Sequence, residues 1–217
     1  MTIQAIETEY KGYRFRSRLE ARWAVFFETA GIEWKYEDQG YEGKGWNGVS
    51  TCRYLPDFYL PPPSGKQGGL FVEVKGDKQS LVRDYEKQIE LHDFGGVLPN
   101  FNGCYYGDET AGLILLSDIP EASKTHLHLH PIIQHYKGLI KSWGFFTSSR
   151  WKPFEIIDGG NKSLARLLDV EPVYGLDSEP EGWCIDTKTV ASKSYFPNVF
   201  NAYAAARKAR FEHGENG

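Results

Sequence analysis

Two short stretches decide the fold: residues 53–60 read RYLPDFYL and residues 70–75 read LFVEVK. Both are rich in aromatic and aliphatic residues and are bounded by proline or glycine, which is typical of strands. The strand period of two places Glu73 and Lys75 on one face of the second stretch and its aliphatic residues on the other. We therefore predict a hairpin that projects these two charged side chains from one face, with Asp57 on the partner strand.

The flanking sequence extends this hairpin into an α/β unit. Helical periodicity begins at Ser17 and ends at Gly31, and a helical pattern returns in residues 80–92. The continuously apolar residues 113–117 are typical of a strand buried on both faces. The other expected elements are a strand-like stretch over residues 12–16, a half-buried strand over residues 32–37 and a glycine-rich loop over residues 40–48. The order helix, three strands, helix, strand predicts a mixed central sheet flanked by helices over residues 1–119.

The remainder, residues 120–217, is predicted to be a C-terminal extension packed on this core. Residues 126–140 suit a strand and a following element, whereas residues 159–195 are rich in turn-forming residues and are predicted to be loops. A terminal helix is expected over residues 198–212.

Four histidines in this extension are candidate metal ligands. His126, His128 and His130 alternate as on one strand face, with His135 nearby, and imidazoles suit zinc or nickel. The solvent side of an edge strand is the favoured interpretation, because no cysteine or carboxylate lies at the usual ligand spacing.

Composition limits the class of protein. The chain has 217 residues, of which 25% are charged and 41% hydrophobic, as in an ordinary globular domain. It shows no signal peptide and no apolar run near the roughly 20 residues of a membrane helix. Its 3 cysteines are widely spaced without a C-x-x-C motif, which favours a reducing compartment such as the cytoplasm. No P-loop is present, so no nucleotide cofactor is expected.

The net charge of -4 gives no nucleic-acid signal by itself, but basic residues cluster locally. Arg14, Arg16 and Arg18 crowd one short segment, and Arg207 lies in the terminal helix beside two further basic residues. We expect these arginines to contact phosphates. For any single one the alternative is a solvated basic face, and Arg207 lies between two aromatic residues that favour a structural role.

The acidic residues of the hairpin suggest metal chemistry. Asp57 and Glu73 lie on adjacent strands, and a pair of carboxylates is what a hard divalent cation such as Mg²⁺ requires. Lys75 is close enough to orient a water or to stabilise developing negative charge. The alternative is a surface hairpin that carries ordinary charges.

The motif Pro56-Asp57 followed by Glu73-Val74-Lys75 resembles the PD-(D/E)XK phosphodiesterase superfamily, which includes restriction, junction-resolving and transposon-end endonucleases. Three stretches, YKGYRFRSRLEARWAVFFE, YLPDFYLP and FVEVKG, together resemble small phage- and actinobacterium-type proteins of that group. The resemblance covers about residues 10–119, with a weaker match in residues 202–215. It implies a restriction-endonuclease-like αβββαβ core.

The resemblance also implies roles for individual residues. Asp57 and Glu73 would hold one or two Mg²⁺ or Mn²⁺ ions, with the Val74 carbonyl as a further ligand, and Lys75 would position the attacking water. Some families carry a glutamate on the first helix, which Glu20 matches, and some use a glutamine from the second helix, which Gln88 matches. Glu20 is also the last residue of the S-x-x-E pattern of a capping box, and the two roles could coexist. For Gln88, a half-buried polar residue bonded to the backbone is the equal alternative.

The sequence thus predicts a metal-dependent DNA endonuclease that hydrolyses phosphodiester bonds with a metal-activated water. Its resemblance suggests a phage or prophage protein that acts in recombination, replication or degradation of DNA in the cytoplasm of a bacterial host cell. Palindromic or branched DNA would favour a homodimer with two sites. The rival interpretation is a non-catalytic DNA-binding or protein-interaction module on a nuclease scaffold, and an RNA nuclease is a third.

Overall fold

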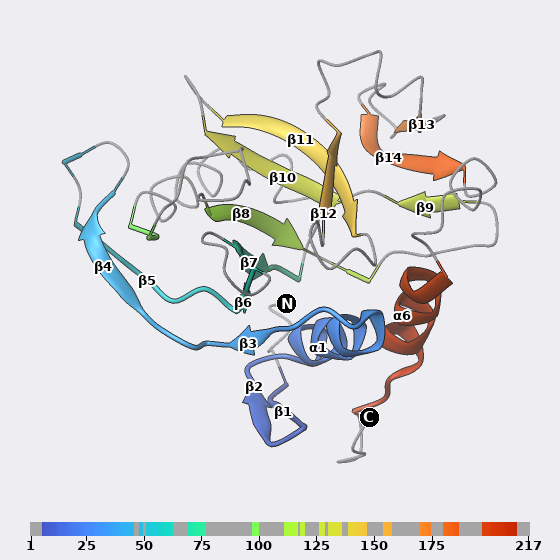
Figure 1. The fold of residues 1–217 in the computed structure, drawn as a ribbon, viewed down its shortest axis with the longest axis horizontal. Helices are drawn as coiled ribbons and strands as arrows, with labels where there is room; N and C mark the ends of the chain where they lie inside the picture. Colours follow the sequence, from blue (N-terminus) through green and yellow to red (C-terminus); the bar gives the residue numbers. More distant parts are fainter. Residues whose placement is uncertain are drawn as a thin grey trace, which may run out of the picture.

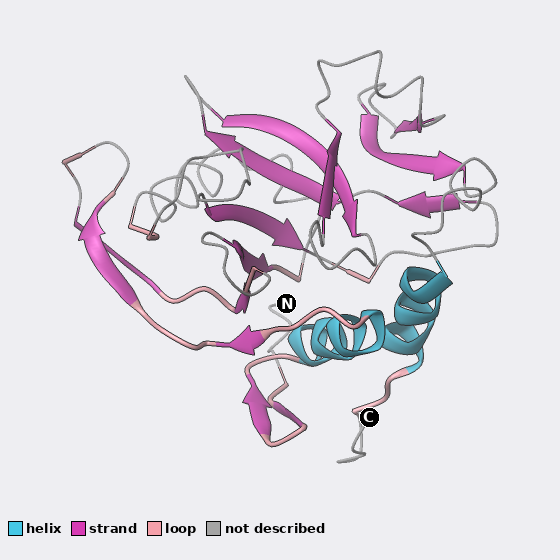
Figure 2. Cartoon of the chain, in the orientation of Figure 1, coloured by secondary structure: helices cyan, strands magenta, loops and turns pink. Residues whose placement is uncertain are grey.

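The computed structural model describes the chain in segments that carry two helices and a set of sheets (Figure 2). The described residues are 6–45, 48–49, 51–62, 69–76, 97–99, 111–116, 118–119, 126–128, 130–135, 139–146, 154–157, 170–174, 180–186 and 197–211. The helix predicted over residues 80–92 lies outside them, and so does Gln88.

A seven-stranded mixed sheet forms the centre of the fold (Figure 1). Its strands are ordered β12-β11-β10-β8-β7-β6-β3, and all neighbours are antiparallel except β7 and β8, which run parallel. The bounds are β3 Lys35–Tyr36, β6 Phe58–Leu60, β7 Gly69–Val74, β8 Ala111–Leu116, β10 His130–His135, β11 Leu139–Phe146 and β12 Phe154–Ile157. The predicted mixed α/β character of the N-terminal region is confirmed, and the sheet continues past residue 119 through β10, β11 and β12.

Two helices lie next to each other on one side of this sheet (Figure 1). Their bounds are α1 Arg18–Ala30 and α6 Pro197–Lys208. Helix α1 begins after Ser17, whose hydroxyl accepts the Glu20 N–H, and ends at Gly31 in the left-handed region with φ 73°. Both ends of α1 are where the sequence predicts them, and the terminal helix is confirmed, although it ends earlier than expected.

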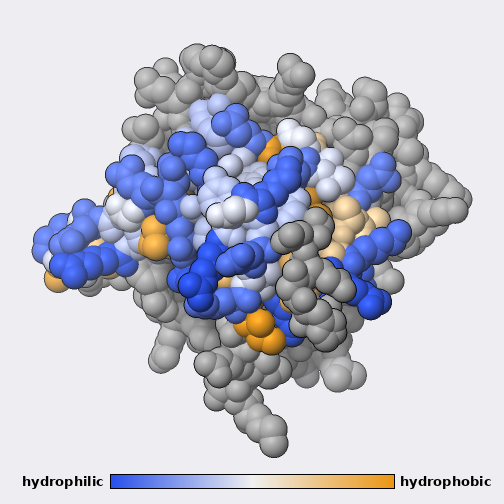
Figure 3. Space-filling model, turned by 90° about the horizontal axis from the view of Figure 1, so that it is seen from below, coloured by the Kyte–Doolittle hydropathy of each residue, from blue (hydrophilic) through white to orange (hydrophobic). Residues whose placement is uncertain are grey.

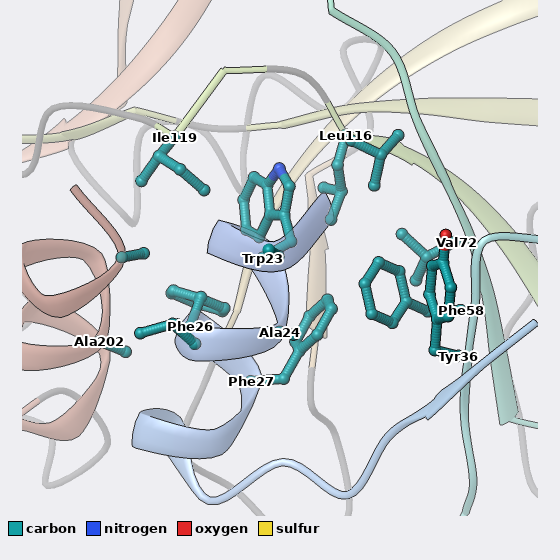
Figure 4. Close-up of a cluster of buried hydrophobic side chains, with 14 of the residues drawn as sticks. Trp23, Ala24, Phe26, Phe27, Tyr36, Phe58, Val72, Leu116, Ile119 and Ala202 are labelled. Carbon is teal, nitrogen blue, oxygen red and sulfur yellow. The ribbon is translucent and has the colours of Figure 1, made fainter. Parts of the chain in front are cut away.

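The aromatic face of α1 fills the space between α6 and the sheet (Figure 4). Trp23, Phe26 and Phe27 are fully buried. The Phe26 ring lies 4.5 Å from that of Tyr203 on α6, and the Phe27 ring lies 5.3 Å from that of Phe58 on β6, measured between centroids. Burial of one such side chain contributes about 2 kcal/mol. This packing fixes α1 against β6 and thereby fixes the position of its N-terminal end.

Strand β7 is buried along its whole length because both of its faces are covered. One face contributes Leu70 and Val72 to the core beside α1, and the other contributes Phe71 to a second cluster with Tyr54. The expected apolar face is confirmed. The opposite face carries Glu73 and Lys75 together, as predicted. Glu73 is nevertheless buried, with 6% of its surface exposed.

Three smaller antiparallel sheets complete the described structure. They are formed by β1 Thr8–Tyr10 with β2 Tyr13–Phe15, by β4 Tyr41–Lys44 with β5 Thr51–Tyr54, and by β13 Val170–Tyr174, β14 Pro180–Asp186 and β9 His126–His128. The β4–β5 hairpin projects from the body at the left of Figure 1, and Figure 3 shows that its described surface is mostly hydrophilic.

Three predictions about loops and strands are wrong. The glycine-rich loop over residues 40–48 contains strand β4, and the loop-rich residues 159–195 contain β13 and β14. Residues 53–60 do not form one strand, because the chain bends at Asp57 between β5 and β6. Proline at position 56 has no N–H for a ladder, which explains why strand pairing stops there.

The histidines of the extension do not share one strand. His126 and His128 belong to β9 in the three-stranded sheet, whereas His130 and His135 belong to β10 in the central sheet. The alternation on one strand face is therefore a wrong prediction, and the zinc interpretation loses the geometry on which it was based.

Gly69→Ala is expected to loosen β7 at its first residue. Gly69 has φ 113°, and a Cβ there would lie 2.8 Å from the Leu60 carbonyl oxygen and from a Tyr59 ring carbon. We expect the free energy of unfolding in urea to fall by about 2 kcal/mol. Gly40→Ala is the control, because its Cβ would meet nothing within 4 Å. Equal stability of the two variants would contradict the assigned conformation.

Candidate active site

Asp57 and Glu73 come together because of the register between β6 and β7. Phe58 pairs with Val72 in antiparallel register, and continuing that register by one residue places Asp57 opposite Glu73. Residues that face each other across antiparallel strands have Cβ atoms about 5 Å apart. The structure therefore brings the predicted carboxylate pair together at the end of the hairpin.

Asp57 is almost completely buried, with 2% of its surface exposed, and each of its oxygens has a partner. Oδ2 accepts the backbone N–H of Val74 at 2.6 Å, and Oδ1 forms an ion pair with the Arg16 guanidinium. The Asp57 side chain thus accepts the Val74 N–H next to Pro56, where the backbone pairing between strands stops. In an extended residue, the N–H and the C=O point toward the same neighbouring strand. We therefore expect the Val74 carbonyl to lie on the Asp57 side of β7, as the Val74 N–H does.

Glu73 has the same kind of environment. Its Oε2 accepts the Tyr54 hydroxyl at 2.8 Å, and its Oε1 forms an ion pair with Lys75 Nζ. The Lys75 side chain is 42% exposed and follows directly after β7. The three motif residues Asp57, Glu73 and Lys75 are thus neighbours, with the carboxylates inside and the ammonium group at the surface.

Burial and the proximity of the two carboxylates disfavour their charged forms. Burial of Asp57 and the nearby Glu73 carboxylate raise the pKa of Asp57 to about 7, against the lowering influence of the Val74 N–H and of Arg16. A second consequence of burial beside Glu73 is a pKa of Tyr54 well above its ordinary value, which keeps its hydroxyl a donor. A cation placed between the carboxylates would offset this effect.

The donor set fits a hard divalent cation. Mg²⁺ is often held by only one or two carboxylates, with waters and substrate phosphates in its other positions. Asp57, Glu73 and the Val74 carbonyl supply such a set. Within the described segments there is no cluster of three or more histidine, cysteine, aspartate or glutamate side chains arranged to hold a metal.

Glu20 has a structural role at the beginning of α1. Its Oε1 accepts the Ser17 hydroxyl at 2.7 Å, and its Oε2 accepts the Tyr36 hydroxyl at 2.5 Å and the Arg16 backbone N–H at 3.2 Å. The Ser17 half of the capping box is formed, because the Ser17 hydroxyl accepts the Glu20 N–H, whereas the Glu20 carboxylate takes the Arg16 N–H one residue before the cap. Glu20 also contributes to the raised pKa of Asp57, so it lies within electrostatic reach of the pair, and its catalytic role stays a prediction.

The structure separates the predicted arginines. Arg16 joins the carboxylates, whereas Arg14 on β2 forms an exposed ion pair with Glu7, the residue before β1. Arg18 is half-buried in the first turn of α1. Arg207 Nη1 donates to the Ile119 carbonyl at 3.0 Å, which ties α6 to the segment after β8 and supports the structural alternative for this residue.

Sequence reasoning missed the two tyrosines that hold the acidic residues. Tyr54 holds Glu73, and Tyr36 holds Glu20. Tyr54 is three positions before Asp57, but its contact with Glu73 depends on the packing of the end of β5 against β7, where Tyr54 and Phe71 share a cluster. Tyr36 stands in the predicted strand period of residues 32–37, which indicated burial but no partner.

Comparisons with known proteins add nothing to this geometry. No protein-family model matches the sequence, and no curated protein or solved structure matches it either. A separate test for membrane segments, applied to the described residues, found no helix with the length and apolar character needed to span a bilayer.

Tyr54→Phe is expected to destabilise the protein by about 1–3 kcal/mol, because it leaves a buried carboxylate oxygen of Glu73 without its donor. Urea unfolding measures the effect. Tyr13→Phe is the control, since Tyr13 is 41% exposed. Equal stability of Tyr54→Phe and wild type would show that this hydroxyl does not hold Glu73.

The raised pKa of Asp57 predicts a stability that falls with pH. The folded protein keeps this proton to about pH 7, whereas the ordinary pKa is 3.8, so between these values the folded state binds more protons. The stabilising contribution is complete below the ordinary pKa and is lost as pH rises through the folded one. Asp57→Asn should therefore flatten the fall in free energy of unfolding between pH 5 and pH 7, and parallel wild-type and variant curves would contradict the shift.

Proposed function

We propose that this protein is a divalent-metal-dependent DNA endonuclease with a restriction-endonuclease-like core of the PD-(D/E)XK type. The observation that supports this most is the buried Asp57–Glu73 pair with Lys75 beside it, at the end of a strand that lies centrally in a mixed sheet. The element order also supports it as far as the chain is described. Helix α1 precedes β3, β6 and β7, and β8 follows parallel to β7, with the β4–β5 hairpin inserted.

Asp57 and Glu73, with the Val74 carbonyl, would hold Mg²⁺ or Mn²⁺. When bound, the metal supplies a more acidic water and neutralises charge on the phosphate. The remaining chemistry belongs to the chain. Lys75 Nζ lies at the surface beside Glu73, where it can donate to the attacking water or to a phosphate oxygen. Tyr54 and the Val74 N–H fix one oxygen of each carboxylate, so the pair is oriented before substrate arrives.

A non-catalytic binding module on the same scaffold remains the second candidate, and one observation favours it. Both oxygens of Asp57 and both oxygens of Glu73 already have partners within the chain. Such a set of contacts could simply be structural. The two candidates differ in whether the pair binds a divalent cation and whether DNA is cut.

A cleavage assay tests the proposal. We expect wild type to cut at least one of supercoiled plasmid, linear duplex, single strands or a four-way junction in Mg²⁺ or Mn²⁺, and a chelator to abolish the reaction. Asp57→Asn and Lys75→Ala should each lower the rate by about 100-fold or more, because they remove groups that act on the transition state. The preferred substrate would separate junction resolution from general cleavage.

Arg53→Gln is the matched control, since Arg53 forms an exposed ion pair with Glu42 on the projecting hairpin. Its rate should stay near that of wild type. Folded wild-type protein that cuts none of these substrates would favour the binding module, and activity that survives in both site variants would place the active site elsewhere.

A further inference from the structure

The contacts of the two buried carboxylates follow one pattern. In each, one oxygen is held by a neutral buried donor, the Val74 N–H or the Tyr54 hydroxyl. The other oxygen forms an ion pair with a basic residue whose side chain reaches the surface. This residue is Arg16 for Asp57 and Lys75 for Glu73. Together, these two basic residues carry the same charge as one divalent cation.

Arg16 can leave Asp57 without disturbing the core. Its backbone N–H is held by the Tyr36 hydroxyl at 3.0 Å and by Glu20 at 3.2 Å, directly before the cap of α1. Its side chain, in contrast, is 57% exposed. The backbone is therefore fixed while the guanidinium has room to move.

A second carboxylate, that of Glu37, lies close enough to hold the released guanidinium. Arg16 Nε lies 2.7 Å from Oε1 of Glu37, yet this buried oxygen receives no aligned hydrogen bond from the described residues. Glu37 itself has φ 43°, and its N–H donates to the Asp57 carbonyl at 3.0 Å, so its backbone is held beside the site. A guanidinium that left Asp57 could align on Glu37 and direct its remaining N–H groups outward.

We propose that Arg16 is the resident counter-ion of Asp57 in the metal-free protein, that a divalent cation displaces it, and that the displaced guanidinium, retained by Glu37, binds a phosphate oxygen of the substrate. The inference rests on the proposed function and deepens it. A divalent cation bound at Asp57 would repel the guanidinium that pairs with the same carboxylate. Metal and DNA should therefore bind cooperatively through Arg16.

Calorimetry with Mn²⁺ alone gives the first test, without DNA or turnover. Arg16→Gln removes the competitor and leaves two carboxylates less compensated, so it should bind Mn²⁺ more tightly than wild type, by about tenfold. Arg53→Gln, which loses an arginine from an exposed ion pair, should stay within about twofold. If Arg16 merely oriented Asp57, Arg16→Gln would instead bind Mn²⁺ more weakly than wild type. Unchanged or weaker binding by Arg16→Gln would overturn the proposal.

Failure of wild type and of Arg16→Gln to bind Mn²⁺ would instead overturn the proposed function itself, so the two failures are distinguishable. Arg16→Lys guards against a folding defect of the glutamine variant. Lysine keeps the charge on Asp57 but lacks the forked guanidinium. It should bind Mn²⁺ about as wild type does, and a large change in its affinity would contradict displacement of a simple counter-ion.

DNA binding with Ca²⁺ or with chelator, measured by fluorescence anisotropy on a short duplex, gives the second test. We expect Ca²⁺ to strengthen wild-type binding by about tenfold, and to do so much less in Arg16→Gln and Arg16→Lys. Arg53→Gln should keep the wild-type enhancement. An enhancement of equal size in the Arg16 variants would show that the guanidinium does not link the two ligands.

Discussion

Two buried carboxylates are the constraint on which the rest of the site depends: Asp57 at the bend before β6, and Glu73 opposite it on β7. Burial raises the pKa of Asp57, and repulsion from the nearby Glu73 carboxylate in poorly screening surroundings raises it further. Donors from four directions offset this repulsion: the Val74 N–H, the Tyr54 hydroxyl, Arg16 and Lys75. Arg16 also connects the pair to the capped beginning of α1, whose aromatic face packs on β6. The packing of the helix and the charge balance of the site are thus parts of one arrangement.

The elements with strong local signals could be predicted from the sequence. Helix α1 has a Ser17 cap, a Gly31 stop and an apolar face, and β8 is a continuous apolar run. The failures lie where a strand depends on a distant partner. Strand β4 exists because it pairs with β5 across a glycine-rich turn, and β13 exists because it pairs with β14. Turn-forming residues dominate those stretches, so their composition predicts loops.

The acidic pair and Lys75 could be predicted because a short motif places them on known strand faces. Their surroundings could not. The sequence indicates that Arg16 belongs to a basic cluster, but its pairing with Asp57 depends on how α1 docks against β6. The burial of Glu73 depends on the second apolar cluster, to which Tyr54 and Phe71 contribute from different sheets. The role of Glu20 in capping α1 could be predicted, because it depends on local sequence alone. Its contacts with Ser17 are observed.

We propose that the buried carboxylate pair is a cation site whose positions are held by basic side chains in the metal-free protein. Anomalous diffraction from crystals grown with Mn²⁺ would locate the cation. We expect an anomalous peak within coordination distance, about 2–2.5 Å, of both Asp57 and Glu73, with the Arg16 guanidinium moved from Asp57 toward Glu37. A peak elsewhere, or a pair still bonded to Arg16 and Lys75 at saturating Mn²⁺, would contradict it.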